Sequence, residues 1–182
     1  MALTATVYHL PVQLSDVDRG VYESLDLRLA RHPSETMRYL LTRLIAYCLS
    51  YEDGIAFSKG GLSSTDEPPV SIRDATGLLL CWIDVGLPSA ERLHKAAKAA
   101  QRVRLFTTVE EAQLQRQARE RPIYKIEQIE VTRIAPSFFD ELEPKVSRHT
   151  KLEILRSDGT IYVTVDGLTL EAPLETLSLQ AA

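Results

Sequence analysis

The first thirty residues alternate apolar and polar side chains in the way that β-strands do. Residues 4–18 (TATVYHLPVQLSDVD) alternate in part and predict a strand, and Pro11 within them indicates an edge strand or a bulge. Leu25, Leu27 and Leu29 then recur at period two, which predicts a second strand with one buried face. We expect the two strands to pair as a hairpin.

The next segment changes to helical spacing. Its apolar stripe consists of Met37, Leu40, Leu41, Leu44, Ile45 and Cys48. This stripe predicts an amphipathic helix. Pro33 and Ser34 are typical of a helix start, Glu35 suits the positive end of a helix in its first turn, and Gly54 marks the end.

The middle of the chain predicts a parallel crossover unit. Residues 78–85 are apolar at nearly every position except Asp84, which indicates a central strand with both faces covered. We expect further strands at 55–58, 70–73 and 103–107, and helices at 89–100 and 109–120. The order strand, helix, strand, helix implies right-handed parallel connections.

The last third returns to alternation. Residues 124–134 predict a strand, residues 136–145 a short helix, and residues 151–172 antiparallel strands with turns at Asp158-Gly159 and Asp166-Gly167. The chain therefore predicts an α/β fold in a single domain over residues 1–182. We expect one mixed sheet with a parallel βαβ centre and antiparallel hairpins at both ends, flanked by helices.

Composition and charge limit the classes of function. The chain has 182 residues, enough for a substantial core, and its net charge of −4 gives no global basic field, so any nucleic-acid contact needs a local patch. Cys48 and Cys81 lie in apolar runs, which predicts buried free thiols in a reducing cytosol. The N-terminus lacks a basic leader, and no apolar run approaches the roughly 20 residues of a membrane span. We expect a cytoplasmic protein without membrane contact.

Asp84 is the first candidate for chemistry, because it ends the central strand just before a crossover helix. Ligands of open α/β sheets bind at that edge. A carboxylate there is costly unless it meets water, a base or a metal ion. The alternative is structural: Asp84 caps the following loop or pairs with an arginine.

Two further acids, Asp66 and Glu67, precede the short strand before Asp84. Carboxylates that converge from adjacent strands suit Mg²⁺ or Mn²⁺, and such a site can activate water and stabilise charge on a phosphodiester. The alternative for this acidic pair is a solvated loop.

A basic partner would come from the helix after Asp84, which carries Arg92, Lys95 and Lys98. A cation near its N-terminal end would orient the attacking water or offset charge in the transition state. A helical wheel places Lys95 roughly opposite the apolar face, and Lys98 also lies off it, so a solvated basic face is the alternative. For Lys98 that alternative is preferred.

These motifs together resemble the YaeQ family over nearly the full length. The matching segments are residues 1–8, Leu29 to Thr36 (LARHPSET), Arg43-Leu44, Asp66 to Pro68 (DEP), Leu80 to Pro88 (LCWIDVGLP), Arg92 and Lys95-Ala96. The resemblance implies a fold related to the PD-(D/E)XK nucleases, in which acids on a hairpin and its partner strand bind the metal.

Carried over by position, the resemblance makes Asp66 and Asp84 the two motif acids, with Glu67 assisting and Glu35 as a helix-borne glutamate. Nucleases of this kind usually carry a lysine two residues after the second acid, and here that position is Gly86. Lys95 is the candidate substitute and Arg92 a phosphate-binding residue.

Two hypotheses follow for function. The first is a Mg²⁺- or Mn²⁺-dependent phosphodiesterase that acts on DNA or RNA, and the retained acids favour it. The second is a non-catalytic member of the same fold that binds nucleic acid or a protein partner, and the missing lysine and the acidic pI of about 5.6 favour it.

Overall fold

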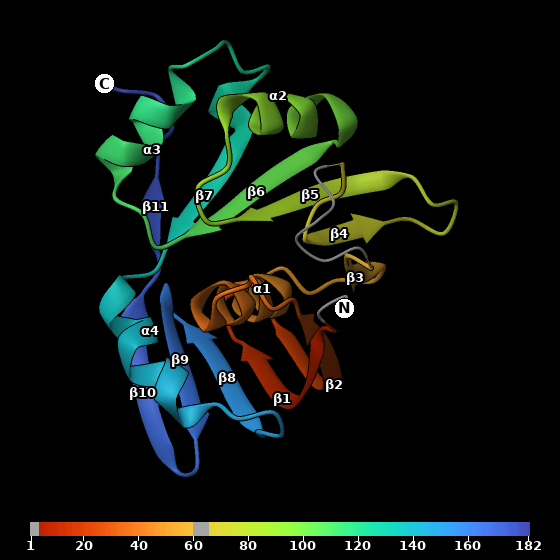
Figure 1. The fold of residues 1–182 in the computed structure, drawn as a ribbon, viewed down its shortest axis with the longest axis vertical. Coiled ribbons are helices and arrows are strands. Elements are labelled where there is room, and N and C mark those ends of the chain that lie inside the picture. The colour runs from red at the N-terminus through yellow and green to blue at the C-terminus, as the bar shows by residue number, and fades with distance from the viewer. Residues whose placement is uncertain (1–3, 60–65) are drawn as a thin grey trace.

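The computed structural model describes residues 4–59 and 66–182, and within them the chain forms two mixed sheets and four helices (Figure 1). The helices are α1 (Met37–Leu49), α2 (Ala90–Ala99), α3 (Glu111–Ala118) and α4 (Pro136–Leu142). The six-stranded sheet consists of β3 (Ile55–Phe57), β4 (Val70–Arg73), β5 (Leu79–Val85), β6 (Arg102–Thr107), β7 (Ile129–Arg133) and β11 (Glu175–Leu177), in the order β11-β7-β6-β5-β4-β3.

The second sheet has five strands, whereas the sequence pattern predicts a single sheet. Its members are β1 (Thr6–Asp16), β2 (Val21–Arg31), β8 (Leu152–Ser157), β9 (Thr160–Val165) and β10 (Leu168–Pro173), in the order β10-β9-β8-β1-β2. The expected hairpins at both chain ends form, but they join each other through parallel pairing of β1 with β8 and do not extend the central sheet. The expectation of one sheet is therefore wrong.

Pro11 lies in an interior strand, so the prediction of an edge is also wrong. The backbone N–H of His9 points toward the β8 side of the strand and donates to the Arg148 carbonyl oxygen at 2.7 Å. The backbone nitrogen of Pro11, two residues later, points to the same side. Continuous pairing with β8 begins only at Val12, beside Leu152. The proline thus lies just before the ladder that would need its missing N–H.

The parallel crossover unit is confirmed. β5 pairs in parallel with β6, and β6 with β7, while α2 and α3 connect them and cover one face of the sheet (Figure 1). β7 is shorter than the predicted strand over 124–134, because Lys125 adopts a left-handed φ of 48° and a 3-10 turn follows at Ile126–Gln128. The short strand β11 was not predicted.

Alternation along β5 decides which side chains meet which layer. Cys81, Ile83 and Val85 belong to the core cluster shared with α1, which lies between the two sheets (Figure 1), whereas Trp82 packs in a second cluster with Leu93 of α2. Asp84 comes next on the Trp82 side and therefore faces α2. The central position predicted for this strand is confirmed.

The predicted turns and thiols are also present. Asp158 and Gly159 have φ of 49° and 69°, as a two-residue hairpin turn of type I′ requires at both positions. Both cysteines are buried and free. None of the helices in the described ranges combines the length and the apolarity needed to cross a bilayer.

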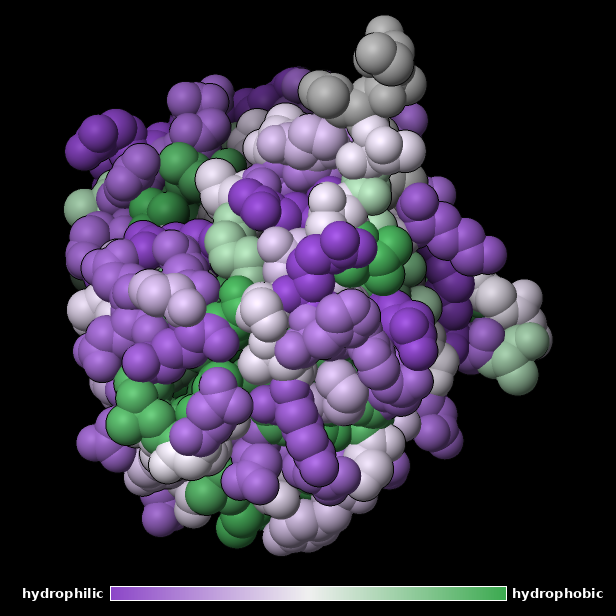
Figure 2. All heavy atoms as spheres, turned by 60° about the horizontal axis from the view of Figure 1, so that its bottom comes forward, coloured by the Kyte–Doolittle hydropathy of each residue, from purple (hydrophilic) through white to green (hydrophobic). Residues whose placement is uncertain are grey.

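The five-stranded sheet turns a polar face outward. Ser24, Asp26 and Arg28 of β2 are exposed and alternate with buried Leu27 and Leu29. Figure 2 shows hydrophilic and hydrophobic residues intermixed on the face turned toward the viewer. One face of this antiparallel-rich sheet is therefore solvated and the other packs on the core.

Candidate active site at the carboxyl end of β5

Asp84 is a buried carboxylate whose hydrogen bonds come from three directions. The residue is 2% exposed. Its Oδ2 accepts from Trp82 Nε1 at 3.1 Å and from Arg92 Nε at 2.6 Å, and its Oδ1 accepts from the Val85 amide at 3.1 Å. These bonds offset the cost of removing the charge from water. The arginine pairing that the sequence left open as an alternative is present.

Arg92 connects strand β5 with the segment that carries the other two acids. Helix α2 begins after Ser89, whose Oγ caps it by accepting from the Arg92 amide at 3.1 Å, and this places Arg92 in the first turn. Its Nη2 donates to the Glu67 carbonyl oxygen at 3.0 Å, and its guanidinium lies 5.3 Å from the centre of the Trp82 ring. One guanidinium thus contacts both Asp84 and the Glu67 backbone.

Asp66 and Lys95 form an ion pair at the mouth of the site. Lys95 Nζ pairs with Asp66 Oδ1, and the Asp66 side chain is 80% exposed. The hydrogen bond from Lys95 is the main reason that the pKa of Asp66 lies below its usual value. Lys95 therefore contacts one of the predicted acids, whereas the helical wheel had left a purely solvated side chain as the alternative.

The ion pair borders a cavity of about 380 Å³ at the start of α2. Its walls are Asp66, Ser89, Glu91, Arg92 and Lys95. Glu67 points its carboxylate elsewhere, because Oε2 accepts from Ser58 Oγ at 3.0 Å. Asp66, Arg92 and Lys95 of the predicted set thus line one cavity, and Asp84 adjoins it through its hydrogen bond with Arg92.

Glu35 does not lie in a helix. Helix α1 begins at Met37 with Thr36 as its cap, so the prediction that the helix starts at Pro33 and Ser34 is wrong. The Thr36 hydroxyl accepts a hydrogen bond from the Tyr39 amide in the first turn of α1, and Glu35 lies just before the helix. The Glu35 carboxylate instead accepts from the His32 amide at 3.1 Å and pairs with Arg43 Nη2 at 3.0 Å. Burial raises the pKa of Glu35 despite the arginine.

Tyr39 lies within electrostatic range of both the Glu35 pair and the Asp84 pair and was missed by the sequence analysis. Burial raises the pKa of Tyr39 to about 12, and the next contribution is the nearby Asp84 carboxylate, followed by Arg43 and Glu35. Tyr39 and Arg43 lie four residues apart in α1, the spacing that places side chains on one side of a helix. That spacing was the available signal for Tyr39 and Arg43.

Gly86 has a backbone that explains the absent lysine. Its φ is +88°, in the left-handed region that favours glycine, while its amide donates to the Phe106 carbonyl oxygen at 2.9 Å. A lysine here would have to adopt that conformation, although a Cβ would meet no atom within 4 Å. The turn after β5 therefore disfavours any side chain at this position.

The acids of this site offer few ligands to a divalent cation. In the part of the chain that the structure describes, no group of three or more His, Cys, Asp or Glu side chains converges closely enough to hold a metal ion. Asp84 Oδ1 accepts a single hydrogen bond, and Asp66 is open to solvent. Mg²⁺ commonly takes one or two carboxylates, with water and substrate phosphate completing its shell. A cation bound here would therefore depend on water or a substrate for most of its ligands.

Comparisons with known proteins identify one family. The family profile described as "YaeQ protein" matches residues 1–174. The chain is 33% identical over 176 residues to an uncharacterised YaeQ protein of Escherichia coli (strain K12), with 96% of each chain covered. The YaeQ crystal structure from Pseudomonas syringae superposes with a TM-score of 0.85 at 31% identity, covering 96% of each chain. The structure from Xanthomonas axonopodis pv. citri gives 0.84 at 30% identity, covering 98% of this chain and all of that one.

Proposed function

This chain belongs to the YaeQ family, and we propose that its β5–α2 site binds a phosphodiester of DNA or RNA and hydrolyses it with a divalent cation. The carrying observation is that Asp66 and Lys95 form an ion pair beside one cavity, and that Arg92, in the wall of the same cavity, pairs with Asp84 at the end of a central strand. The resemblance to the PD-(D/E)XK nucleases is part of this proposal.

Asp66 and Asp84 would hold Mg²⁺ or Mn²⁺, with Glu67 close by in sequence. The ion, when bound, supplies a Lewis acid and a water of lowered pKa. Lys95 is half-exposed beside the cavity, so its ammonium can orient a water molecule or offset charge on the phosphate. Glu35 is a positioning residue in this scheme, because its carboxylate is buried against Arg43.

The start of α2 supports phosphate binding next to the two acids. Ser89, the cap of α2, lines the cavity, so the positive end of the helix dipole lies near it, and Arg92 adds a guanidinium. A guanidinium presents a planar fork of donors that matches phosphate oxygens. Arg92 is therefore the phosphate-binding residue of the proposal.

A second candidate is a non-catalytic module that binds nucleic acid or a protein through the same surface. The specific observation in its favour is that Arg92 and Lys95 already neutralise both acids. Gly86 also provides no side chain where the lysine of the nucleases would lie.

Cleavage of labelled single-stranded DNA, duplex DNA and RNA with Mn²⁺ or Mg²⁺ separates the two candidates. We expect metal-dependent cleavage by the wild type and its loss in Asp84→Asn, Asp66→Asn and Lys95→Met, with calorimetric Mn²⁺ binding lost in the two aspartate variants. Asp140→Asn, which alters an acid paired with Arg38 on the surface, is the matched control. Cleavage that survives Asp84→Asn contradicts the nuclease. Nucleic-acid binding without cleavage or Mn²⁺ binding establishes the second candidate instead.

A further inference from the structure

A second charged cavity lies between the two sheets, on the face of β6 away from α2. It measures about 330 Å³, and its walls include Arg19, Arg104, Phe106, Glu130, Thr132 and Arg156. Arg104 and Phe106 alternate along β6 with Val103 and Leu105, which pack in the cluster with α2 and α3. This inter-sheet cavity is therefore separate from the β5–α2 site.

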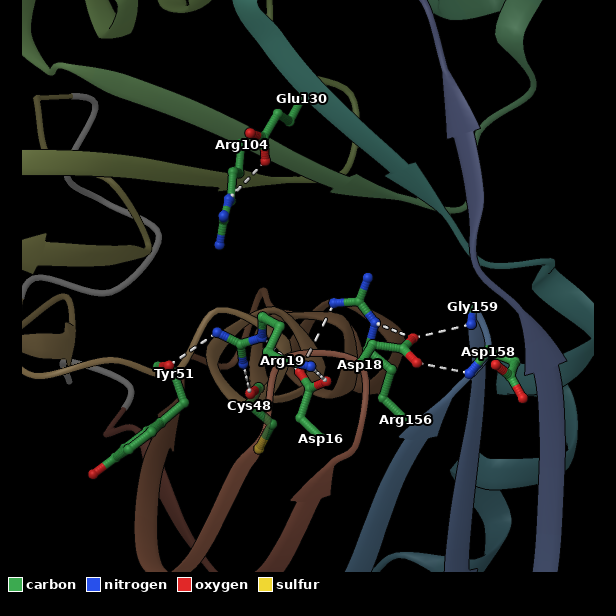
Figure 3. Close-up of polar contacts among 10 residues, drawn as sticks. All are labelled: Asp16, Asp18, Arg19, Cys48, Tyr51, Arg104, Glu130, Arg156, Asp158 and Gly159. Atoms are coloured by element: carbon green, nitrogen blue, oxygen red, sulfur yellow. Dashed lines mark hydrogen bonds and ion pairs between the residues drawn. The ribbon is translucent and has the colours of Figure 1, made fainter.

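Arg19 is a structural member of the wall. Its Nε donates to Asp16 Oδ2 at 2.6 Å, and Nη1 donates to the Tyr51 carbonyl oxygen at 3.0 Å (Figure 3). Asp16 is fully buried. The pair ties the turn between β1 and β2 to the end of α1, and its donors are used within the protein.

The carboxylate of Asp18 is likewise engaged. It accepts from the Asp158 amide at 2.7 Å and the Gly159 amide at 3.0 Å, which secures the turn between β8 and β9 beside the cavity. Those amides, Gly159 first, hold the pKa of Asp18 below its usual value, so the group stays ionised. Asp18 therefore orders the wall and is not an open acid facing a ligand.

Arg156 is held by ion pairs that leave part of its guanidinium facing the cavity. Its Nε lies 3.3 Å from Asp18 Oδ2 without a hydrogen-bonding orientation, and its Nη1 lies 3.8 Å from Asp16 Oδ2. Figure 3 shows the remaining nitrogen directed upward, toward the six-stranded sheet.

Arg104 reaches toward Arg156 from the opposite sheet. Its Nε donates to Glu130 Oε2 at 2.8 Å, while Nη1 and Nη2 have no hydrogen-bond partner within residues 4–59 and 66–182. Figure 3 shows these two nitrogens directed down into the gap. Two partly buried guanidinium groups thus face each other across a cavity. Each is ion-paired on its own sheet and turns further N–H donors toward the space between them, where an anion would be attracted by both charges.

We propose that this inter-sheet cavity binds the phosphate group of a small phosphorylated molecule, held between Arg104 and Arg156. A tetrahedral phosphate has enough oxygens to accept hydrogen bonds from two guanidinium groups on opposite sides. A planar carboxylate already has both of its oxygens bound by a single guanidinium. The Thr132 side chain adds a hydroxyl and Phe106 an apolar wall for the remainder of the ligand. The volume matches the lower end of known small-molecule pockets, about 300 Å³.

The test is calorimetric titration of the full chain with phenyl phosphate, and with benzoate as the matched carboxylate. We expect phenyl phosphate to bind, and Arg104→Gln to weaken its affinity about tenfold or more, because charge-assisted hydrogen bonds are lost. Arg102→Gln is the matched control, since Arg102 lies two residues earlier on β6 and pairs with Glu52 outside the cavity. Arg156→Gln should weaken binding as well, and thermal unfolding verifies that each variant is folded.

Lys95→Met distinguishes the two phosphate sites. Binding that persists in Lys95→Met and is lost in Arg104→Gln belongs to the inter-sheet cavity, whatever the outcome of the nuclease experiments. The proposal is overturned by absence of binding at millimolar phenyl phosphate, by equal losses in Arg102→Gln and Arg104→Gln, or by loss in Lys95→Met alone. Benzoate binding as tight as that of phenyl phosphate overturns the phosphate assignment.

Discussion

Arg92 Nε lies 2.6 Å from Asp84 Oδ2, so a cation from the first turn of α2 neutralises the acid that ends β5. This pair explains how a nearly inaccessible carboxylate is tolerated at the end of an otherwise apolar strand. It also couples stability to the proposed chemistry, because the same oxygen that pairs with Arg92 belongs to a proposed metal ligand.

Replacing Asp84 with asparagine should lower the free energy of unfolding by about 1.5–3 kcal/mol, the range for hydrogen bonds to charged groups. The Arg92 side chain is 21% exposed and regains some hydration, so the loss should stay below the roughly 3–5 kcal/mol of a fully buried broken pair. Urea unfolding measures it. In the control Asp140→Asn, which breaks a surface pair, the loss should be about 1 kcal/mol or less. Equal stability of Asp84→Asn and wild type would show that the pair contributes nothing.

Lys95→Met should raise the pKa of Asp66 toward its usual value of 3.8, because the hydrogen bond from Lys95 is the main cause of the lowered pKa. In the wild type the ion pair is complete above pH 3.8 and is lost as the pH falls through the lowered pKa. NMR titration of the Asp66 carboxyl carbon measures the shift. Lys98→Met is the control, since Lys98 Nζ lies 4.2 Å from the Tyr124 ring centre. An unchanged Asp66 pKa in Lys95→Met would refute the pairing.

Glu35→Gln should change how stability depends on pH. The pKa of Glu35 is raised by burial, so the folded state holds a proton that the unfolded chain releases near pH 4.5. Its contribution to stability is complete below pH 4.5 and is lost as the pH rises through the raised pKa. As the pH rises above 4.5, the wild type should therefore lose stability relative to Glu35→Gln. Urea unfolding at a series of pH values measures this difference.

Asp74→Asn supplies a control of opposite sign for that experiment. The pKa of Asp74 is lowered, first by its hydrogen bond from Thr76, so its contribution is present above pH 3.8 and is lost on acidification. The same pH trend in both variants would contradict the assignment for Glu35.

Gly54→Ala should destabilise the protein more than Gly77→Ala. Both glycines have a φ of +89°, so each alanine incurs about 1–2 kcal/mol of left-handed strain. At Gly54 the new Cβ would also lie 1.9 Å from the Arg73 carbonyl oxygen, whereas at Gly77 it would meet nothing within 4 Å. We expect the clash to add about 1–3 kcal/mol in thermal or urea unfolding. Equal losses would show that the backbone at Gly54 and Arg73 moves apart readily and relieves the clash.

The sequence predicted most strands and the pairing of strands that follow one another, but not the pairing of distant strands. Leu27 and Leu29 were assigned correctly to a buried face from their spacing alone. The pairing of Val12 with Leu152 could not be read from spacing, because it joins segments from opposite ends of the chain. β11 has only three residues, too few for a periodic pattern.

The candidate site was predicted to a similar extent. Asp66, Asp84 and Lys95 were selected from residue type and position, and the structure places them beside one cavity or one arginine. Tyr39 and Arg43 were not selected, because their local sequence does not show which strand the helix approaches. Their role depends on the approach of α1 to the end of β5, which is a tertiary contact.

By itself, the sequence determined the apolar faces of the longer strands and the positions of the Asp-Gly turns. It also determined that an acid ends the central strand. These features are local, because side-chain direction alternates along a strand whatever its neighbours are. Only the tertiary structure decided that the strands divide into two sheets, that Arg92 and Lys95 neutralise the two acids, and that Arg104 and Arg156 face each other between the sheets. Those relationships join distant segments, whose encounter depends on burial of the whole core and not on any local period.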